Sequence, residues 1–134
     1  MNVRNSGSQA IRIEQDVVLA RQAARKLAQE CGLRLIDLTK LVTAVSELAR
    51  NTMVYGGGGD MDWEIVEDGI RVGLRLTFRD EGPGIPDLKL AMTDGWTSGG
   101  GLGLGLTGAK RLVDDFELDT APGKGTRVMI AKWT

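Results

Sequence analysis

The stretch WTSGGGLGLGLTGAKRL, residues 96–112, constrains the fold more than any other part of the chain. It places six glycines within ten residues, directly before a helix-like pattern. Glycine loses the most backbone freedom on folding, so such a segment costs stability unless a function requires it. Free backbone N–H groups at a helix start bind anions, and glycine lets the backbone approach a phosphate closely. The stretch therefore predicts a phosphate-binding loop.

Three common phosphate-binding motifs do not explain this loop. Gly103, Gly105 and Gly108 match G-x-G-x-x-G, but a dinucleotide fold needs a strand directly before the motif. It also needs an acidic residue about 20 positions further on, where Val128 stands. The sequence contains no G-x-x-x-x-G-K-[ST] segment and no histidine, so a Walker A loop and the H-R-D loop of eukaryotic-type kinases are excluded.

The composition removes further classes of protein. With no histidine and only Cys31 as cysteine, the chain cannot be a Ser-His-Asp hydrolase, a His-ligated zinc enzyme or a kinase that phosphorylates its own histidine. Cys31 falls on an apolar helical stripe and is interpreted as a small core residue. The net charge of −1 gives no electrostatic basis for binding nucleic acid or an anionic membrane. Because no apolar run resembles a signal core or a membrane helix, we expect a cytoplasmic protein.

Apolar periodicity predicts an α+β chain. The expected helices cover residues 16–31, 37–55, 87–92 and 104–116, with Asp16 as the N-cap of the first and Gly32 as its stop. The expected strands cover residues 10–15, 61–65 and 70–78, followed by a closing hairpin of ELDT and TRVMIAKW. Without a linker or repeat, residues 1–134 are expected to form one domain, an α/β sandwich with one mixed sheet and helices on one face.

Three further motifs accompany the glycine-rich loop. In SELARN, Glu47 and Asn51 are four residues apart and share one helix face. In DEGPGIP, Asp80 ends a strand and a Gly-x-Gly turn follows, and GKGT places the hydroxyl of Thr126 at a tight turn. The run GGGG at residues 56–59 is interpreted as a flexible turn between helix and strand.

In this order, SELARN, DEGPGIP, GGGLGLGL and GKGT resemble the boxes of the GHKL ATPase superfamily, whose members share the Bergerat ATP-binding fold. The segments AVSELARN, GGLGLGLTGAKRL and the terminal AKW are similar to the bacterial switch serine/threonine kinases, which include the anti-sigma-factor kinases and the RsbT kinases of the stressosome. The resemblance implies ATP and Mg²⁺ as cofactors, STAS-domain proteins as substrates and a PP2C-type phosphatase as a second partner.

The resemblance also implies a role for each site residue. Asp80 would accept a hydrogen bond from the adenine amino group, with Thr126 assisting, while Gly82 and Gly84 let the backbone pass beside the base. Asn51 would supply an oxygen ligand to Mg²⁺, and Glu47 would be the general base. The residues that wrap the phosphates would be Gly99, Gly100, Gly101, Leu102, Gly103, Leu104 and Gly105.

Several alternatives stay open at this point. Arg50 contacts either phosphate or Glu47, Lys110 either neutralises phosphate or lies on an outer face, and Trp96 belongs either to a lid or partner surface or to the core. Two other functions fit the same motifs. One is an anti-sigma factor that holds a sigma subunit, and the other is a nucleotide-gated binding module that transfers no phosphate.

Overall fold

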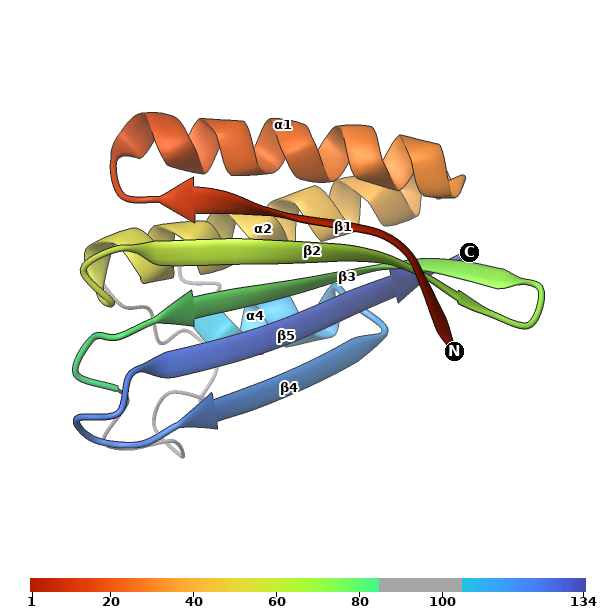
Figure 1. Ribbon diagram of the computed structural model, residues 1–134. Helices are drawn as coiled ribbons and strands as arrows, with labels where there is room; N and C mark the ends of the chain where they lie inside the picture. The colour runs from red at the N-terminus through yellow and green to blue at the C-terminus, as the bar shows by residue number, and fades with distance from the viewer. Residues whose placement is uncertain (85–104) are drawn as a thin grey trace.

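The protein is described by a computed structural model over residues 1–84 and 105–134. Its strands are β1 Asn2–Ile11, β2 Gly59–Asp68, β3 Arg71–Asp80, β4 Asp115–Thr120 and β5 Thr126–Trp133, in the order β1-β2-β3-β5-β4. Its helices are α1 Glu14–Cys31, α2 Leu35–Val54 and α4 Gly105–Arg111. Figure 1 shows these helices on one side of the sheet. The predicted α+β sandwich is confirmed.

Every strand pairing in the sheet is antiparallel, so the predicted mixed sheet is wrong in this respect. The strand pairs β2–β3 and β4–β5 are hairpins, which are antiparallel by construction. Between β1 and β2 the chain forms the α1–α2 helical hairpin, which returns it to the end of the sheet that it left. Ile11 therefore stands opposite Gly59, and β2 runs back along β1.

The core lies between the sheet and the helices. On β3, Leu74, Leu76 and Phe78 are buried at every second position, so the next residue of that face is Asp80. The register pairs Asp80 with Thr126 of β5. The helix-facing rows of two neighbouring strands thus end in polar groups instead of apolar ones.

The first strand and the first helix differ from their predicted bounds. β1 covers Asn2–Ile11, whereas the sequence predicts a strand over residues 10–15. Asp16 is not the N-cap: helix α1 begins at Glu14, and the Asp16 carboxylate accepts hydrogen bonds from the backbone N–H groups of Arg12 at 2.9 Å and Ile13 at 3.2 Å. Asp16 still satisfies free N–H groups at the helix start, but from inside the first turn. Gly32 ends the helix as predicted, with a φ of 86°.

The helix predicted over residues 104–116 is shorter in the structure. Helix α4 ends at Arg111, and Phe116 lies in β4, opposite Ile130 of β5. Pairing with β5 overrides the helical spacing of the apolar residues, because propensity and periodicity are weaker than tertiary contacts. The helix predicted over 87–92 lies outside the described residues. None of the described helices has the length and apolar character to span a membrane.

Candidate functional site

Helix α2 carries the first two predicted site residues, Glu47 and Asn51, one turn apart. Glu47 is 7% exposed, and none of the described residues forms a hydrogen bond or ion pair with its carboxylate. Among the described residues, the Thr107 hydroxyl is the one fully enclosed polar side-chain atom without a hydrogen-bond partner, so the Glu47 oxygens keep some contact with solvent and are open to a ligand. Asn51 lies half-buried on the following turn.

Arg50, for which the sequence leaves a phosphate or Glu47 as partner, forms an ion pair with a residue of another helix. Its guanidinium is 2.8 Å from the carboxylate of Glu14, at the start of α1. This ion pair ties the two helices together on the exposed side. Lys110 is exposed on α4, and Trp96 lies outside the described residues.

The backbone of several glycines packs closely around Asp80. The N–H of Gly82 donates a hydrogen bond to Asp80 Oδ1 at 2.9 Å. A Cβ on Gly56 would overlap the Asp80 carboxylate, and a Cβ on Gly125 would overlap its carbonyl oxygen. Gly82 itself faces the backbone of Gly56, where a Cβ would stand 2.7 Å from its Cα. Only glycine fits at these three positions.

The environment of Asp80 raises the pKa of its carboxyl above the ordinary value. Burial is the main cause, because it penalises the charged form, and hydrogen bonds from the backbone N–H groups of Gly82 and Thr126 oppose it in part. A desolvated carboxylate at the end of a strand is typical of a binding site.

Two hydroxyl groups lie beside Asp80 on neighbouring strands. Thr126 Oγ1 and Thr120 Oγ1 are 2.9 Å apart, and Thr120 Oγ1 donates to the carbonyl oxygen of Gly125 at 3.0 Å. Thr120 stands directly opposite Thr126 in the β4–β5 register. The GKGT turn therefore places Thr126 opposite Asp80 in the sheet, with the hydroxyl of a second threonine in contact with its own.

The segment that follows the C-terminal end of α2 contacts Asp80 through Gly56. The carbonyl oxygen of Asn51 accepts hydrogen bonds from the N–H groups of Tyr55 at 2.9 Å and Gly56 at 3.0 Å. Because Gly56 is also in contact with Asp80, the helix that carries Glu47 and Asn51 ends against the strand end that carries Asp80. The structure thus brings these motifs to one end of the sheet.

The glycine-rich loop is described only at its end. Gly99, Gly100, Gly101, Leu102, Gly103 and Leu104 lie outside the described residues. Gly105 opens α4 with a φ of 57°, which favours glycine, and Gly84 has a φ of 75° with no room for a Cβ beside the carbonyl oxygen of Ala121. On α4, two residues after Gly105, the buried hydroxyl of Thr107 has no hydrogen-bond partner among the described residues.

A cavity of about 650 Å³ opens at the same end of the sheet. Asp80, Gly125 and Thr126 line it, together with Thr120 and Lys124. Glu47 and Asn51 are not among its lining residues, so within the described parts of the chain the cavity accounts for one side of the predicted site and not for the α2 side.

Three residues of this site are not predicted by the sequence. Gly56 falls in a run that is interpreted as a flexible turn, yet it is buried against Asp80. Gly125 enters the prediction only as part of its turn, and Thr120 has no predicted role. Their contribution depends on contacts between segments far apart in the sequence, and the only local signal is the density of glycine itself.

The family model for histidine kinase-, DNA gyrase B- and HSP90-like ATPases matches residues 36–133, which include α2, the Asp80 turn and the GKGT turn. The chain belongs to this family. The predicted GHKL assignment is therefore confirmed.

Relatives within the family narrow the assignment. The serine/threonine-protein kinase RsbT of Bacillus subtilis strain 168 is 46% identical over 123 residues, covering 92% of each chain. The anti-sigma F factor of Bacillus licheniformis is 31% identical over 128 residues, covering 90% of this chain and 86% of the relative. These relatives bear out the predicted enzyme class, an ATP-dependent serine/threonine protein kinase of the RsbT type.

Two solved structures share the fold. The RsbU and RsbW domains of a Mycobacterium tuberculosis protein match with a TM-score of 0.66 at 17% identity; the match covers 96% of this chain and 32% of that one. The mycobacterial sensor histidine kinase MprB matches with a TM-score of 0.55 at 19% identity, over 96% of this chain and 97% of the other. At these identities the comparison supports the fold alone.

Proposed function

We propose that this kinase transfers the γ-phosphoryl group of Mg-ATP to serine or threonine residues of STAS-domain proteins. When released from them, it activates a PP2C-type phosphatase, as the resemblance to the stressosome kinases implies. We further propose that residues 1–134 form one cytoplasmic domain and that its partners include neither nucleic acid nor a membrane. The observation that carries the proposal is Glu47, a nearly buried residue whose carboxylate has no partner among the described residues, one turn before Asn51 on a helix that ends against Asp80.

The Asp80 end of the sheet suits an adenine nucleotide. Asp80 is a hydrogen-bond acceptor at the edge of a cavity, Thr126 also lines this cavity, and the glycines packed against Asp80 bring backbone and no side chain to that contact. These groups would hold the amino group of the base. The Thr107 hydroxyl, directly after the glycine-rich loop, suits a phosphate oxygen, since a buried polar group without a partner in the described structure requires an explanation.

The site also suits Mg²⁺ held in the manner usual for nucleotide enzymes. The described residues contain no cluster of three or more acidic, cysteine or histidine side chains that could hold a metal by themselves. Mg²⁺ keeps several waters and is bound by few protein ligands together with substrate phosphates, so the amide oxygen of Asn51 would suffice. When bound, the ion neutralises charge on the phosphates.

In the transfer itself, Glu47 accepts the proton of the acceptor hydroxyl. The hydroxyl oxygen forms a bond to the γ-phosphorus, the bond from that phosphorus to the β–γ bridging oxygen breaks, and ADP leaves. Because phosphoryl transfer needs little covalent assistance, most of the rate enhancement comes from positioning and charge neutralisation. General base catalysis by Glu47 is expected to contribute about 10²- to 10⁴-fold.

A phosphotransfer assay tests the proposal. Protein, Mg²⁺ and γ-labelled ATP are incubated with a STAS-domain protein, using wild type, Glu47→Gln and the control Glu30→Gln, which changes an exposed carboxylate at the end of α1. The expected result is label on serine or threonine, lost only in Glu47→Gln, while ADP binding measured by calorimetry stays unchanged. Retained transfer in Glu47→Gln would overturn the general-base role.

Two other results would redirect the assignment. Tight ADP binding without any transfer by the wild type would indicate a nucleotide-gated binding module, and no nucleotide binding would overturn the ATP site. The anti-sigma F factor relatives favour a second candidate, an anti-sigma-factor kinase that holds a sigma subunit. A stable complex with a purified sigma factor, formed only with bound nucleotide, would favour this candidate over the stressosome kinase.

A further inference from the structure

Lys132 of β5 is a buried cation that the proposed chemistry does not use. Its side chain is 10% exposed. It stands opposite the buried Leu74 in the sheet, so its stem lies on the helix-facing side. Lysine is almost never buried unless it is paired, and removing one partner of a buried pair leaves an uncompensated charge.

The Lys132 ammonium lies between carboxylates from two different helical regions. Its Nζ is 3.3 Å from Asp114 Oδ1 and 3.6 Å from Asp37 Oδ1. Asp37 lies in the first turn of α2, and Asp114 follows the end of α4 by three residues. One cation of β5 therefore joins the start of α2 to the turn between α4 and β4.

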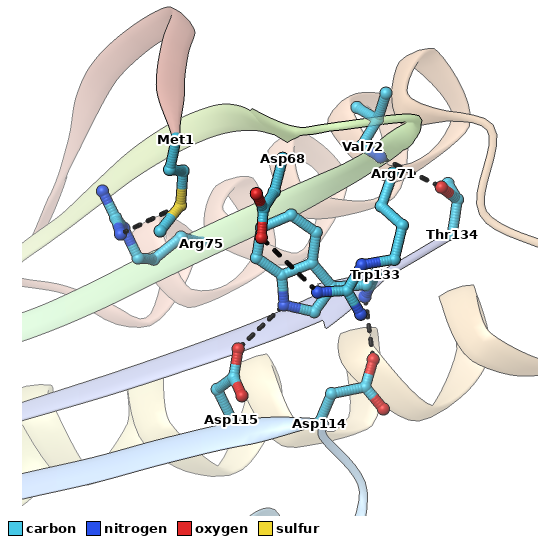
Figure 2. A network of polar contacts seen from close by, with 9 residues as sticks. All are labelled: Met1, Asp68, Arg71, Val72, Arg75, Asp114, Asp115, Trp133 and Thr134. Atoms are coloured by element: carbon cyan, nitrogen blue, oxygen red, sulfur yellow. Dashed lines mark hydrogen bonds and ion pairs between the residues drawn. The ribbon is translucent and has the colours of Figure 1, made fainter.

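Asp114 is itself held in place from a second side. Its Oδ2 accepts a hydrogen bond from the backbone N–H of Trp133 at 2.8 Å, and its own N–H donates to the carbonyl oxygen of Ala131 at 2.9 Å. Figure 2 shows the neighbouring residues Asp114 and Asp115 both bound to Trp133, with Asp115, the first residue of β4, accepting from the indole Nε1 at 2.8 Å. The carboxylate that Lys132 binds is thus fixed to β5 and cannot follow α2 independently.

Both segments joined by this bridge lead to the proposed functional groups. Asp37 precedes Glu47 by ten residues on α2, about 15 Å along the helix axis at 1.5 Å per residue. Helix α4 follows the glycine-rich segment directly. Because a helix is stiff, fixing the start of α2 relative to the end of α4 also fixes Glu47 relative to the residues that follow that segment.

We propose that Lys132 is a positioning residue for phosphoryl transfer: by binding Asp37 and Asp114 together, it sets the placement of α2 relative to α4. This inference rests on the proposed kinase function, because the placement matters for catalysis only if both helices act on one nucleotide. Adenine recognition by Asp80 and Thr126 is expected to depend little on the bridge, because the bridge holds the start of α2, whereas Gly56 meets Asp80 beyond the other end of that helix.

The first test separates binding from transfer. Lys132→Met keeps the length of the side chain and removes its charge, and Lys132→Arg keeps a cation that can reach both carboxylates. Arg75→Met is the matched control: it removes a half-buried cation from the neighbouring strand, where Arg75 is paired to Glu64 at 2.8 Å. Lys132→Met is expected to lower the transfer rate at saturating ATP at least tenfold, with the Kd for ADP changed less than threefold. Lys132→Arg is expected to restore most of the rate, and Arg75→Met to leave it unchanged.

The second test measures the helix placement directly and does not need kinase activity. Nitroxide labels at the exposed positions 40 on α2 and 110 on α4, in a Cys31→Ala background, report the interhelical distance by pulsed EPR. The distance distribution is expected to be narrow with Lys132 and at least twice as wide in Lys132→Met. Asp37→Asn, which removes one half-exposed carboxylate of the bridge, is expected to widen it as well and serves if Lys132→Met does not fold.

The outcomes distinguish failure of the positioning role of Lys132 from failure of the proposed kinase function. A distribution of unchanged width in Lys132→Met or Asp37→Asn would overturn the positioning role. The role would also be overturned if Lys132→Met lost only thermal stability while its folded fraction transferred phosphate at the wild-type rate. If the wild type transferred no phosphate, the kinase function would fail, and the distance measurement would still decide whether the bridge positions the helices.

Discussion

The two ends of the sheet are held together by opposite means. At the end where β3 stops, the backbones of Gly56, Gly82 and Gly125 close around Asp80, which borders an open cavity. At the end where β5 stops, side chains occupy the space instead, and Lys132 and Trp133 bind carboxylates. Figure 2 shows how closely the groups around Trp133 are connected.

The difference separates two tasks within one small protein. Close backbone packing needs no side-chain atoms, so it can hold Asp80 at a cavity and leave room for a ligand. A network of charged side chains leaves little room for a ligand, but it fixes the ends of helices in place. The first arrangement suits binding, and the second suits the alignment of the elements that act on what is bound.

The largest expected effect comes from adding one carbon atom at the glycine-packed end. In Gly56→Ala, the new Cβ would overlap the Asp80 carboxylate, so both must shift. We expect the free energy of unfolding to fall by about 1–3 kcal/mol, as in other overpacked sites, and ADP affinity to fall at least tenfold. Urea unfolding and calorimetry measure the two effects.

The neighbouring glycine provides the control. Gly57 has a φ of 75°, and a Cβ added there would meet nothing within 4 Å. Asparagine tolerates such a backbone. Gly57→Asn is therefore expected to leave both quantities nearly unchanged. Equal losses in the two variants would mean that chain flexibility, and not close packing on Asp80, explains the glycine run.

At the opposite end, Asp114→Asn is expected to cost less stability and no nucleotide affinity. Asparagine keeps one acceptor oxygen, so either Lys132 or the Trp133 N–H loses its partner. Because Asp114 is partly exposed, we expect the free energy of unfolding to fall by about 1–2 kcal/mol. Asp115→Asn, whose amide oxygen can still accept from the indole N–H, is the control for chemical denaturation. Reduced ADP affinity in Asp114→Asn alone would contradict the separation of the two ends.

A smaller effect is expected from Trp133→Phe. The ring that Arg71 covers at 4.7 Å is kept in part, while the hydrogen bond from Nε1 to Asp115 is lost. One such bond contributes about 0.5–1.5 kcal/mol net. Thermal unfolding should show this loss, and a loss of the same size in Asp115→Ala and in the Asp115→Ala, Trp133→Phe double variant would confirm that the two groups act through one bond.

The smallest effect is on the pH dependence of stability, to which Asp62 and Asp80 of the sheet are expected to contribute with opposite signs. The hydrogen bond from Arg79 lowers the pKa of Asp62 on the exposed sheet face, so its stabilisation is present above the ordinary pKa and is lost as pH falls towards the lowered one. Such a surface pair contributes about 0.2–1 kcal/mol. Burial raises the pKa of Asp80, so stability is instead lost as pH rises from the ordinary pKa to the raised one. Unfolding curves between acidic and neutral pH should therefore change slope in opposite directions in Asp62→Asn and Asp80→Asn.

Apolar periodicity predicts the long helices because their buried faces are strongly patterned. Val17, Ala20, Ala24 and Leu27 recur at helical spacing, and all are buried in α1. The bounds of β1 are not predictable in this way, because most of its residues are polar and exposed and no alternation marks it. Its place depends on pairing with β2, and pairing between distant segments leaves no local signal.

The site is predictable only where a motif carries its chemistry. Glu47, Asn51, Asp80 and Thr126 stand in ordered boxes with informative spacing, and the structure places Asp80 beside Thr126 and against the end of α2. The role of Gly56 is hidden, because a glycine in a turn and a glycine in close contact are identical in sequence. The Lys132 bridge is hidden too, since its two carboxylates come from other elements, one of them near the start of α2.

The edge strand β1 has a consequence for how the protein behaves at high concentration. Among the described strands, β1 is paired on one side only, and its register with β2 shifts between Val3 and Asn5, where Arg4 is paired with Glu67. An irregular, polar and charged edge is a poor template for a further strand from another molecule. The chain can therefore keep an open sheet edge without offering a starting point for fibrils.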